Sequence, residues 1–231
     1  MPMIGRRIYP GMKRAAWGFM QSGDFPVPVL WLKFGKNTGT EAKDSSPEGN
    51  DGTIEGASWV DGILGPGLEF DGIDNYVDCG ADESLDNAYP ITIIFWINTA
   101  TPAQAFKRVI TSGSGFTYSF SVITVDDKKL QFGYGESVAD NTKKTSFMLG
   151  TSVWQQVALI LQTDMTDAEC YLNSVAGTIT VGGGTTLDVG NVTLGRRPIG
   201  TSYLSGILDD VRIYDIALTA AQIRQIYLGY R

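Results

Sequence analysis

Histidine is missing from this chain of 231 residues, and long apolar runs are missing as well. Without imidazole there is no Ser-His-Asp triad, no Cys-His pair and no histidine-ligated zinc site. The apolar stretches, such as residues 91–97, are short, whereas a membrane-spanning helix needs about 20 residues. Any enzymatic chemistry would therefore have to use carboxylates, and no membrane span is expected.

Cysteine is scarce too. Cys79 and Cys170 lie far apart and match no metal-ligand spacing. Each lies in a strand-like run, where a small buried thiol is a common filler, so free thiols are favoured over a disulfide. The N-terminal residues are basic but have no apolar core of about 7–15 residues followed by a cleavage site. No secretory signal is expected.

Charge is unevenly distributed along the chain. Residues 1–23 contain basic groups and no acid, which leaves 14 basic residues against 25 acidic ones in the remainder. An acidic body repels nucleic acid and anionic lipid, so neither is an expected partner.

Residues 1–27 form a basic arm that is broken by prolines. A solvated tail is one interpretation, but the many large apolar side chains favour a segment that becomes ordered against a partner. We expect the arm to dock on neighbouring structural subunits of an oligomeric assembly, through Arg6, Arg7, Tyr9, Arg14 and Trp17.

From residue 28 to residue 231 the chain consists of short strand-like runs separated by turn-forming clusters. This pattern is typical of an all-β sandwich or barrel. The predicted strands are residues 29–34, 53–55, 67–70, 76–79, 91–98, 108–112, 118–124, 129–134, 145–149, 155–162, 169–172, 177–180, 192–195 and 206–214.

Two of these segments are apolar at both parities, residues 91–97 and 157–161, so both strands are predicted to be central and covered on both faces. One helix is predicted at the C-terminal end. Thr219 and Gln222 form a capping box at its start, and Gly229 provides a stop.

The order and spacing of several motifs carry a family resemblance. The motifs are Asn50-Asp-Gly-Thr-Ile-Glu-Gly-Ala-Ser-Trp59, Gly67-Leu-Glu-Phe-Asp-Gly-Ile-Asp-Asn-Tyr-Val77, residues 91–97, Trp154-Gln-Gln-Val-Ala158, Cys170-Tyr-Leu-Asn173 and residues 208–219. Together they resemble a LamG-like jelly roll of the concanavalin A-like lectin/glucanase superfamily. The resemblance implies a two-sheet antiparallel jelly-roll sandwich over residues 28–231, with one short C-terminal helix and the N-terminal arm.

Asp209 is the sharpest chemical signal in the sequence. Strict alternation along residues 206–214 places it on the apolar face, together with Ile207 and Val211. A buried carboxylate needs a cation or backbone donors, and the resemblance implies a structural calcium ligand here, completed largely by main-chain oxygens. The alternative is a hydrogen-bonded aspartate that caps the turn at residues 71–75.

Asp71, Asp74 and Asn75 form a second group of oxygen ligands. Lectin-like relatives place calcium near a comparable turn, so the resemblance implies a metal contact here. Ordinary turn chemistry, in which these side chains bond to their own backbone, is the alternative.

Sugar recognition needs exposed aromatic rings beside polar groups. Tyr118, Tyr134 and Tyr203 lie in or beside Gly/Ser-rich segments, where loops could present them to a ligand. Structural roles are the alternative. Trp96 and Trp154 lie in the most apolar segments and are expected in the core.

Catalysis is not expected. The related retaining glucanases carry a Glu-x-Asp-x-x-Glu string that places paired acids on one face of a strand, and this chain has no such string. We expect a non-enzymatic lectin-like module that binds glycans or a host surface, in a phage virion decoration or tail protein at the virion surface. The alternatives are a secreted or cell-surface carbohydrate-binding protein and a carboxylate glycoside hydrolase.

Overall fold

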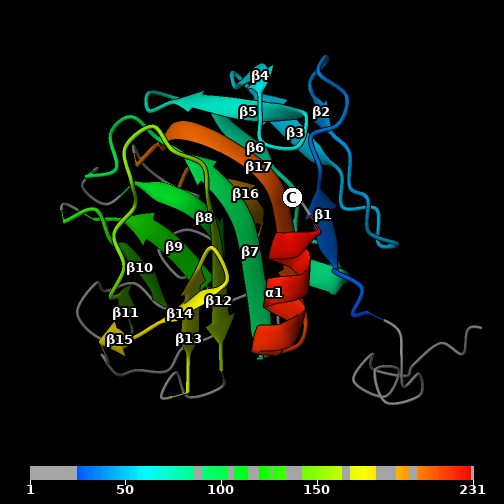
Figure 1. Cartoon of the computed structure of the whole chain (residues 1–231). Coiled ribbons are helices and arrows are strands. Elements are labelled where there is room, and N and C mark those ends of the chain that lie inside the picture. Colours follow the sequence, from blue (N-terminus) through cyan, green and yellow to red (C-terminus); the bar gives the residue numbers. More distant parts are fainter. Residues whose placement is uncertain are drawn as a thin grey trace, which may run out of the picture.

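A computed structural model describes residues 25–85, 90–103, 107–113, 120–125, 127–133, 142–162, 167–180, 191–197 and 202–229. Within these residues the chain forms two antiparallel sheets that are stacked face to face, with one short helix against them (Figure 1). The predicted all-β, two-sheet sandwich with a C-terminal helix is confirmed. No helix in this part of the chain is long and apolar enough to cross a membrane.

The first sheet, sheet A, has the strand order β14-β13-β12-β7-β17-β5-β4, and β1 also pairs with β17. Its strands are β1 (Leu30–Leu32), β4 (Ser58–Asp61), β5 (Pro66–Asp71), β7 (Ile91–Asn98), β12 (Gln155–Leu161), β13 (Glu169–Leu172), β14 (Val175–Gly177) and β17 (Ser205–Tyr214). β7 and β12 are central and buried along nearly their whole length, as their apolar sequences predict.

The second sheet, sheet B, has the order β15-β11-β10-β9-β8-β16-β6-β3-β2. Its strands are β2 (Glu41–Ala42), β3 (Gly52–Glu55), β6 (Tyr76–Asp78), β8 (Arg108–Ser112), β9 (Phe120–Thr124), β10 (Leu130–Gly133), β11 (Thr142–Thr145), β15 (Ile179–Thr180) and β16 (Val192–Leu194). A short 3-10 helix, η2, covers Glu83–Leu85.

Four strands of the two sheets depart from the sequence prediction. β2, β4 and β14 were not expected, because none of them shows an apolar alternation. The strand predicted at residues 145–149 lies instead at β11, before an apolar stretch that belongs to the following loop. Pairing with β10 and β15, which is a long-range contact, selects these residues over the more apolar ones.

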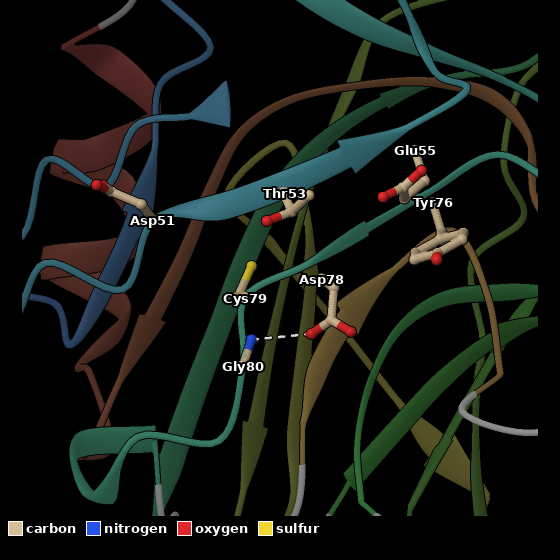
Figure 2. A pocket seen from close by; sticks show the side chains of 7 residues that line it. All are labelled: Asp51, Thr53, Glu55, Tyr76, Asp78, Cys79 and Gly80. Atoms are coloured by element: carbon tan, nitrogen blue, oxygen red, sulfur yellow. Dashed lines mark hydrogen bonds between the residues drawn. The ribbon is translucent and has the colours of Figure 1, made fainter. Parts of the chain in front are cut away.

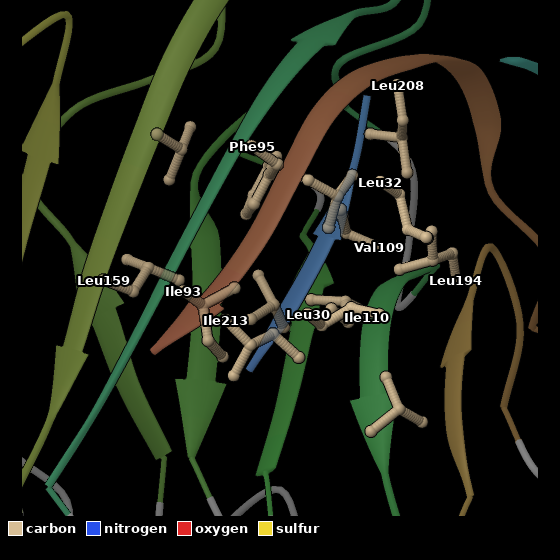
Figure 3. Packing of buried hydrophobic residues seen from close by; sticks show 14 of the residues in the cluster. Leu30, Leu32, Ile93, Phe95, Val109, Ile110, Leu159, Leu194, Leu208 and Ile213 are labelled. Carbon is tan, nitrogen blue, oxygen red and sulfur yellow. The ribbon is translucent and has the colours of Figure 1, made fainter. Parts of the chain in front are cut away.

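The main core lies between the two sheets. Its side chains come from β1, β7, β12 and β17 on one side and from β8 and β16 on the other (Figure 3). The labelled residues are all almost fully buried: Leu30, Leu32, Ile93, Phe95, Val109, Ile110, Leu159, Leu194, Leu208 and Ile213. Burial of apolar surface on this scale is the main source of stability of a sandwich.

A second, smaller apolar cluster covers the outer face of sheet A. It combines Ile94, Ala158 and Tyr214 of the sheet with Ile223 and Ile226 of α1 (Ala220–Leu228). The predicted capping box is present, since the side chains of the N-cap residue and the third helical residue each bond to the backbone of the other. Helix α1 therefore explains why the central strands are apolar on both faces.

A β-bulge in β17 overturns the predicted orientation of Asp209. Asp209 pairs with Trp96, but Arg212 pairs with Ile94, so β17 contains one residue more than β7 over this stretch. Leu208 and Val211 consequently both face the main core, although their parities differ. Strict alternation is wrong here, because Asp209 faces outward from sheet A, away from Val211.

The bulge carries a buried ion pair. Asp210 has a φ of 48°, a conformation that aspartate tolerates better than most residues. Its carboxylate accepts the indole N–H of Trp31 at 2.6 Å and pairs with the Arg212 guanidinium at 3.0 Å. The guanidinium in turn lies 4.3 Å from the Trp31 ring centroid. These contacts tie β1 to the bulged segment of β17.

Candidate functional site

The outer face of sheet B is polar, in contrast to the helix-covered outer face of sheet A. One cross-strand row runs through Thr53, Asp78, Thr193, Thr111 and Ser121, on five adjacent strands. Most of the residues that alternate with this row belong to the main core. Period-two alternation therefore places hydroxyl and carboxyl groups together on this face.

A groove of about 380 Å³ lies at the β3–β6 end of this face. Its lining residues are Asp51, Thr53, Glu55, Tyr76, Asp78, Cys79 and Gly80. Figure 2 shows Thr53 and Glu55 on β3 beside Tyr76 and Asp78 on β6. Two neighbouring strands thus provide two carboxylates, a hydroxyl and a phenol ring to one hollow, and its volume lies within the usual range for small-molecule sites.

Arg196, two residues beyond the end of β16, contacts two of the residues that line this groove. The Arg196 guanidinium carbon lies 3.5 Å from the Tyr76 ring centroid, and its Nη2 lies 3.5 Å from Asp78 Oδ2. The Arg196 carbonyl accepts the hydroxyls of Thr111 and Thr193 at 3.2 and 3.4 Å. These hydrogen bonds to Thr111 and Thr193 therefore fix Arg196, whose guanidinium lies against one face of the Tyr76 ring.

Asp78 is the most constrained carboxylate of the groove. It accepts the backbone N–H of Gly80 at 2.9 Å and the side-chain amide of Asn191 at 3.1 and 3.2 Å, in addition to its contact with Arg196. Donors from three residues thus hold its orientation. Glu55, by contrast, is exposed on the other wall.

The groove residues were not singled out from the sequence, although one signal was available. Polar residues alternate with buried ones in both β3 and β6, which places Thr53, Glu55, Tyr76 and Asp78 on the solvent side. That β3 and β6 are neighbours, and that Arg196 returns to them, depends on pairings across the whole chain.

Asp209 is fully buried and serves as an acceptor for the β4–β5 hairpin. Its Oδ2 accepts the backbone N–H groups of Ile63 and Leu64 at 2.9 and 3.0 Å. Burial raises its pKa to about 6, while these amide hydrogen bonds act in the opposite direction. The turn that it caps is therefore residues 62–65 and not residues 71–75.

The predicted calcium ligands do not come together. Asp71 pairs with Ser205, four residues before Asp209 on β17, which corresponds to about 13 Å along a strand. Two N–H donors point at Asp209 Oδ2, so this oxygen is already engaged, whereas Oδ1 has no hydrogen-bond partner among the described residues. No cluster of three acidic or cysteine side chains suited to a metal occurs among the described residues. Calcium binding itself stays a prediction.

The turn at residues 71–75 is held by its own side chains. Asp71 Oδ1 accepts the backbone N–H of Ile73 at 2.8 Å and that of Asp74 at 3.4 Å. Reorienting the Asn75 amide lets it donate to Asp74 and accept from the Asp71 backbone. This is the turn chemistry considered as the alternative to a metal contact.

The other predicted site residues have separate outcomes. Tyr203 is half-buried just before β17. Tyr118 and Tyr134, together with the predicted docking residues Arg6, Arg7, Tyr9, Arg14 and Trp17, lie outside the described residues. Among the tryptophans, Trp96 is buried as predicted, whereas Trp154 is only half-buried and belongs to neither apolar cluster.

Both cysteines are free and buried, as predicted. Burial raises the pKa of the Cys79 thiol strongly and that of the Cys170 thiol to about 11. Neither thiol is suited to nucleophilic chemistry near neutral pH, because the reactive form is the thiolate.

Several solved structures share this fold. Domain 4 of AbnA, a GH43 extracellular arabinanase from Geobacillus stearothermophilus, in complex with arabinotriose, matches at a TM-score of 0.69 and 16% identity, over 88% of this chain and 100% of that chain. The binding domain of botulinum neurotoxin serotype D/C matches at 0.67 and 15%, over 89% and 52%. Trypanosoma rangeli sialidase matches at 0.65 and 15%, over 90% of this chain but 34% of that chain.

The last two proteins are thus much longer than the region they share with this chain. No curated protein sequence shows a significant match. The family Laminin_G_3, described as the concanavalin A-like lectin/glucanases superfamily, matches residues 71–224. This range runs from the end of β5 into α1 and includes most of both sheets. The chain therefore belongs to the concanavalin A-like lectin/glucanase superfamily.

Proposed function

We propose that this protein binds carbohydrate, without hydrolysing it, in the groove between β3 and β6. The observation that carries the proposal is the combination of Tyr76, Asp78, Thr53 and Glu55 in one hollow of about 380 Å³. Sugars present hydroxyl groups around a ring with apolar C–H faces. Carboxylates and threonine hydroxyls bond the former, and an aromatic ring packs on the latter.

The contacts of Asp78 favour binding over hydrolysis. A glycosidase needs two carboxyl groups, one of which exchanges a proton with the leaving group. Donors from Gly80, Asn191 and Arg196 occupy the Asp78 oxygens. Asp78 is therefore committed to shaping the groove wall. Asp51, the third carboxylate that lines the groove, is engaged as well, because it pairs with Lys43 and accepts the backbone N–H of Asp44. Glu55 is thus left without an unengaged carboxylate among the described groove residues with which to divide the acid and base roles.

The structural neighbours support a sugar ligand. One is an arabinanase domain in complex with arabinotriose, and another is a toxin binding domain. The fold also occurs within a sialidase chain. The fold by itself is therefore compatible with both binding and hydrolysis, and the proposal depends on the groove.

A glycan array followed by calorimetry with the best ligand tests this proposal. We expect Tyr76→Ala and Glu55→Gln each to weaken binding at least tenfold, since the first removes the aromatic ring and the second removes a carboxylate acceptor from the groove. Glu69→Gln is the matched control, because Glu69 is an exposed carboxylate on β5 of the other sheet. Absence of any glycan ligand, binding that survives both groove substitutions, or turnover of laminarin, agarose or alginate above a buffer blank would overturn the proposal.

We further propose that the module is displayed on a phage virion as a decoration or tail protein and that residues 1–27 anchor it to neighbouring subunits. Four basic groups and several large apolar side chains within 27 residues support a docking role. Deleting residues 1–24 should leave a folded domain that no longer enters its assembly. Normal incorporation of the truncated protein would contradict the anchor, and unfolding would place these residues in the sandwich.

A further inference from the structure

Three polar side chains form a cross-strand row on the outer face of sheet A. Gln156 on β12 pairs with Trp96 on β7, and Trp96 pairs with Asp209 on β17. Val157, Phe95 and Leu208, which are strand neighbours of Gln156, Trp96 and Asp209 respectively, face the main core. Because residues in register share a face, the three side chains lie next to one another outside that core.

All three side chains are buried, and each has an unsatisfied polar atom. Gln156, Trp96 and Asp209 expose 1%, 6% and 0% of their surface. Within the described part of the chain, four of their atoms have no hydrogen-bond partner: Gln156 Nε2, Gln156 Oε1, Trp96 Nε1 and Asp209 Oδ1. Buried polar atoms without a partner are rare in folded proteins, because their desolvation is not compensated. Three such residues side by side indicate a shared partner.

Donors and acceptors both occur in the row, and this combination selects the partner. Trp96 Nε1 and Gln156 Nε2 are donors, whereas Asp209 Oδ1 and Gln156 Oε1 are acceptors. A cation would face the two donors, and an anion would face the carboxylate. A hydroxyl group donates and accepts at once, so it satisfies both kinds of atom.

The surroundings hold the row in place. Tyr227 of α1 stacks on Trp96, with 5.7 Å between ring centroids and 24° between ring planes. At one end, Asp209 holds the amides of the β4–β5 hairpin. At the other end, the Gln156 backbone N–H donates to the Asn173 side chain, and the Asn173 backbone N–H donates to the Gln156 carbonyl.

The geometry points to a buried site for hydroxyl groups along Gln156, Trp96 and Asp209, on the sheet opposite the groove. Its ligand is a chain of ordered water molecules or a small polyol, which present the same chemistry. This site is independent of the proposed sugar groove, since the two are built from different sheets.

High-resolution crystal structures grown without and with glycerol identify the occupant. Isolated oxygen density within hydrogen-bond distance of Trp96 Nε1 and Asp209 Oδ1 in polyol-free crystals supports the site and assigns it to water. Carbon-linked density in the glycerol crystals, with a melting temperature that saturates as glycerol increases, supports it and assigns it to a polyol. Dry packing of the row in both crystals would overturn the proposal.

A double-mutant cycle tests whether one ligand connects the two ends of the row. Gln156 and Asp209 are separated by Trp96, about 10 Å apart across two strand spacings, where independent substitutions are additive within about twofold in the unfolding constant. We expect Gln156→Met and Asp209→Asn to be non-additive by more than about threefold. Additive effects would overturn the proposal.

A control cycle on the same three strands separates a bridging ligand from general coupling through the sheet. Ile160 and Tyr214 flank Thr92 in the same register relation. Ile160→Val and Tyr214→Phe are expected to be additive. Equal non-additivity in both cycles would show that the sheet, and not a ligand, transmits the effect, and would overturn the proposal.

Discussion

Replacing Asp209 by asparagine tests whether burial of this carboxylate costs stability at neutral pH. The side chain is fully buried, and desolvation raises its pKa from the ordinary 3.8 to about 6. At 1.36 kcal/mol per pKa unit, this shift means that the folded environment disfavours the ionised form, relative to the protonated form, by about 3 kcal/mol of free energy. Asparagine keeps an acceptor for the amides of Ile63 and Leu64 but cannot ionise.

The sign of the pH dependence follows from whether the folded or the unfolded state binds the Asp209 proton more tightly. Between pH 4 and pH 6 the folded protein retains the Asp209 proton, whereas the unfolded chain releases it. The unfolded state therefore gains stability as pH rises, and the wild-type free energy of unfolding falls relative to that of Asp209→Asn. We expect this relative loss to approach about 3 kcal/mol and to level off above pH 6. The contributions of the other carboxyl groups to the free energy of unfolding are common to both proteins, so they cancel in the difference.

Urea denaturation of both proteins at several pH values from 4 to 7 measures this difference. Thr219→Ala is the control, because it removes a capping hydrogen bond and no ionisable group, so its difference from wild type should not change with pH. A flat difference for Asp209→Asn, or one in which wild type gains stability with rising pH, would refute the assignment of a buried, desolvated carboxylate.

Three other predictions concern the helix, the bulge and calcium. Asp210→Ala leaves the Arg212 guanidinium buried without its carboxylate and should cost about 3–5 kcal/mol in urea denaturation; a loss below about 1 kcal/mol, typical of an exposed pair, would contradict the buried ion pair. Thr219→Ala removes the N-cap of α1 and should cost about 1 kcal/mol, whereas Gln225→Ala, in the middle of the helix, should change little; equal losses would argue against the cap. If calcium binds at Asp209, as the sequence predicts, the melting temperature should be higher in excess calcium than in EDTA, and Asp209→Asn should abolish the difference; superimposed wild-type melts would contradict calcium binding.

Local sequence patterns predicted much of this fold. Apolar residues at both parities identified β7 and β12 as central strands, and Thr219 and Gln222 identified the start of α1. These features are readable because they depend on neighbours within one strand or one helical turn. The fold class followed from the order of several such segments.

The candidate sites depended on the tertiary structure. Alternation failed at Asp209 because β1 and β5 pair with successive parts of β17, and the extra residue between them reverses the parity of the strand. The groove and the row formed by Gln156, Trp96 and Asp209 likewise consist of residues far apart in the chain. Sequence by itself determined which side is polar in regular strands such as β3 and β6. Only strand pairing decided which polar sides meet, because register is set by contacts across the whole sheet and not by the residues of one strand.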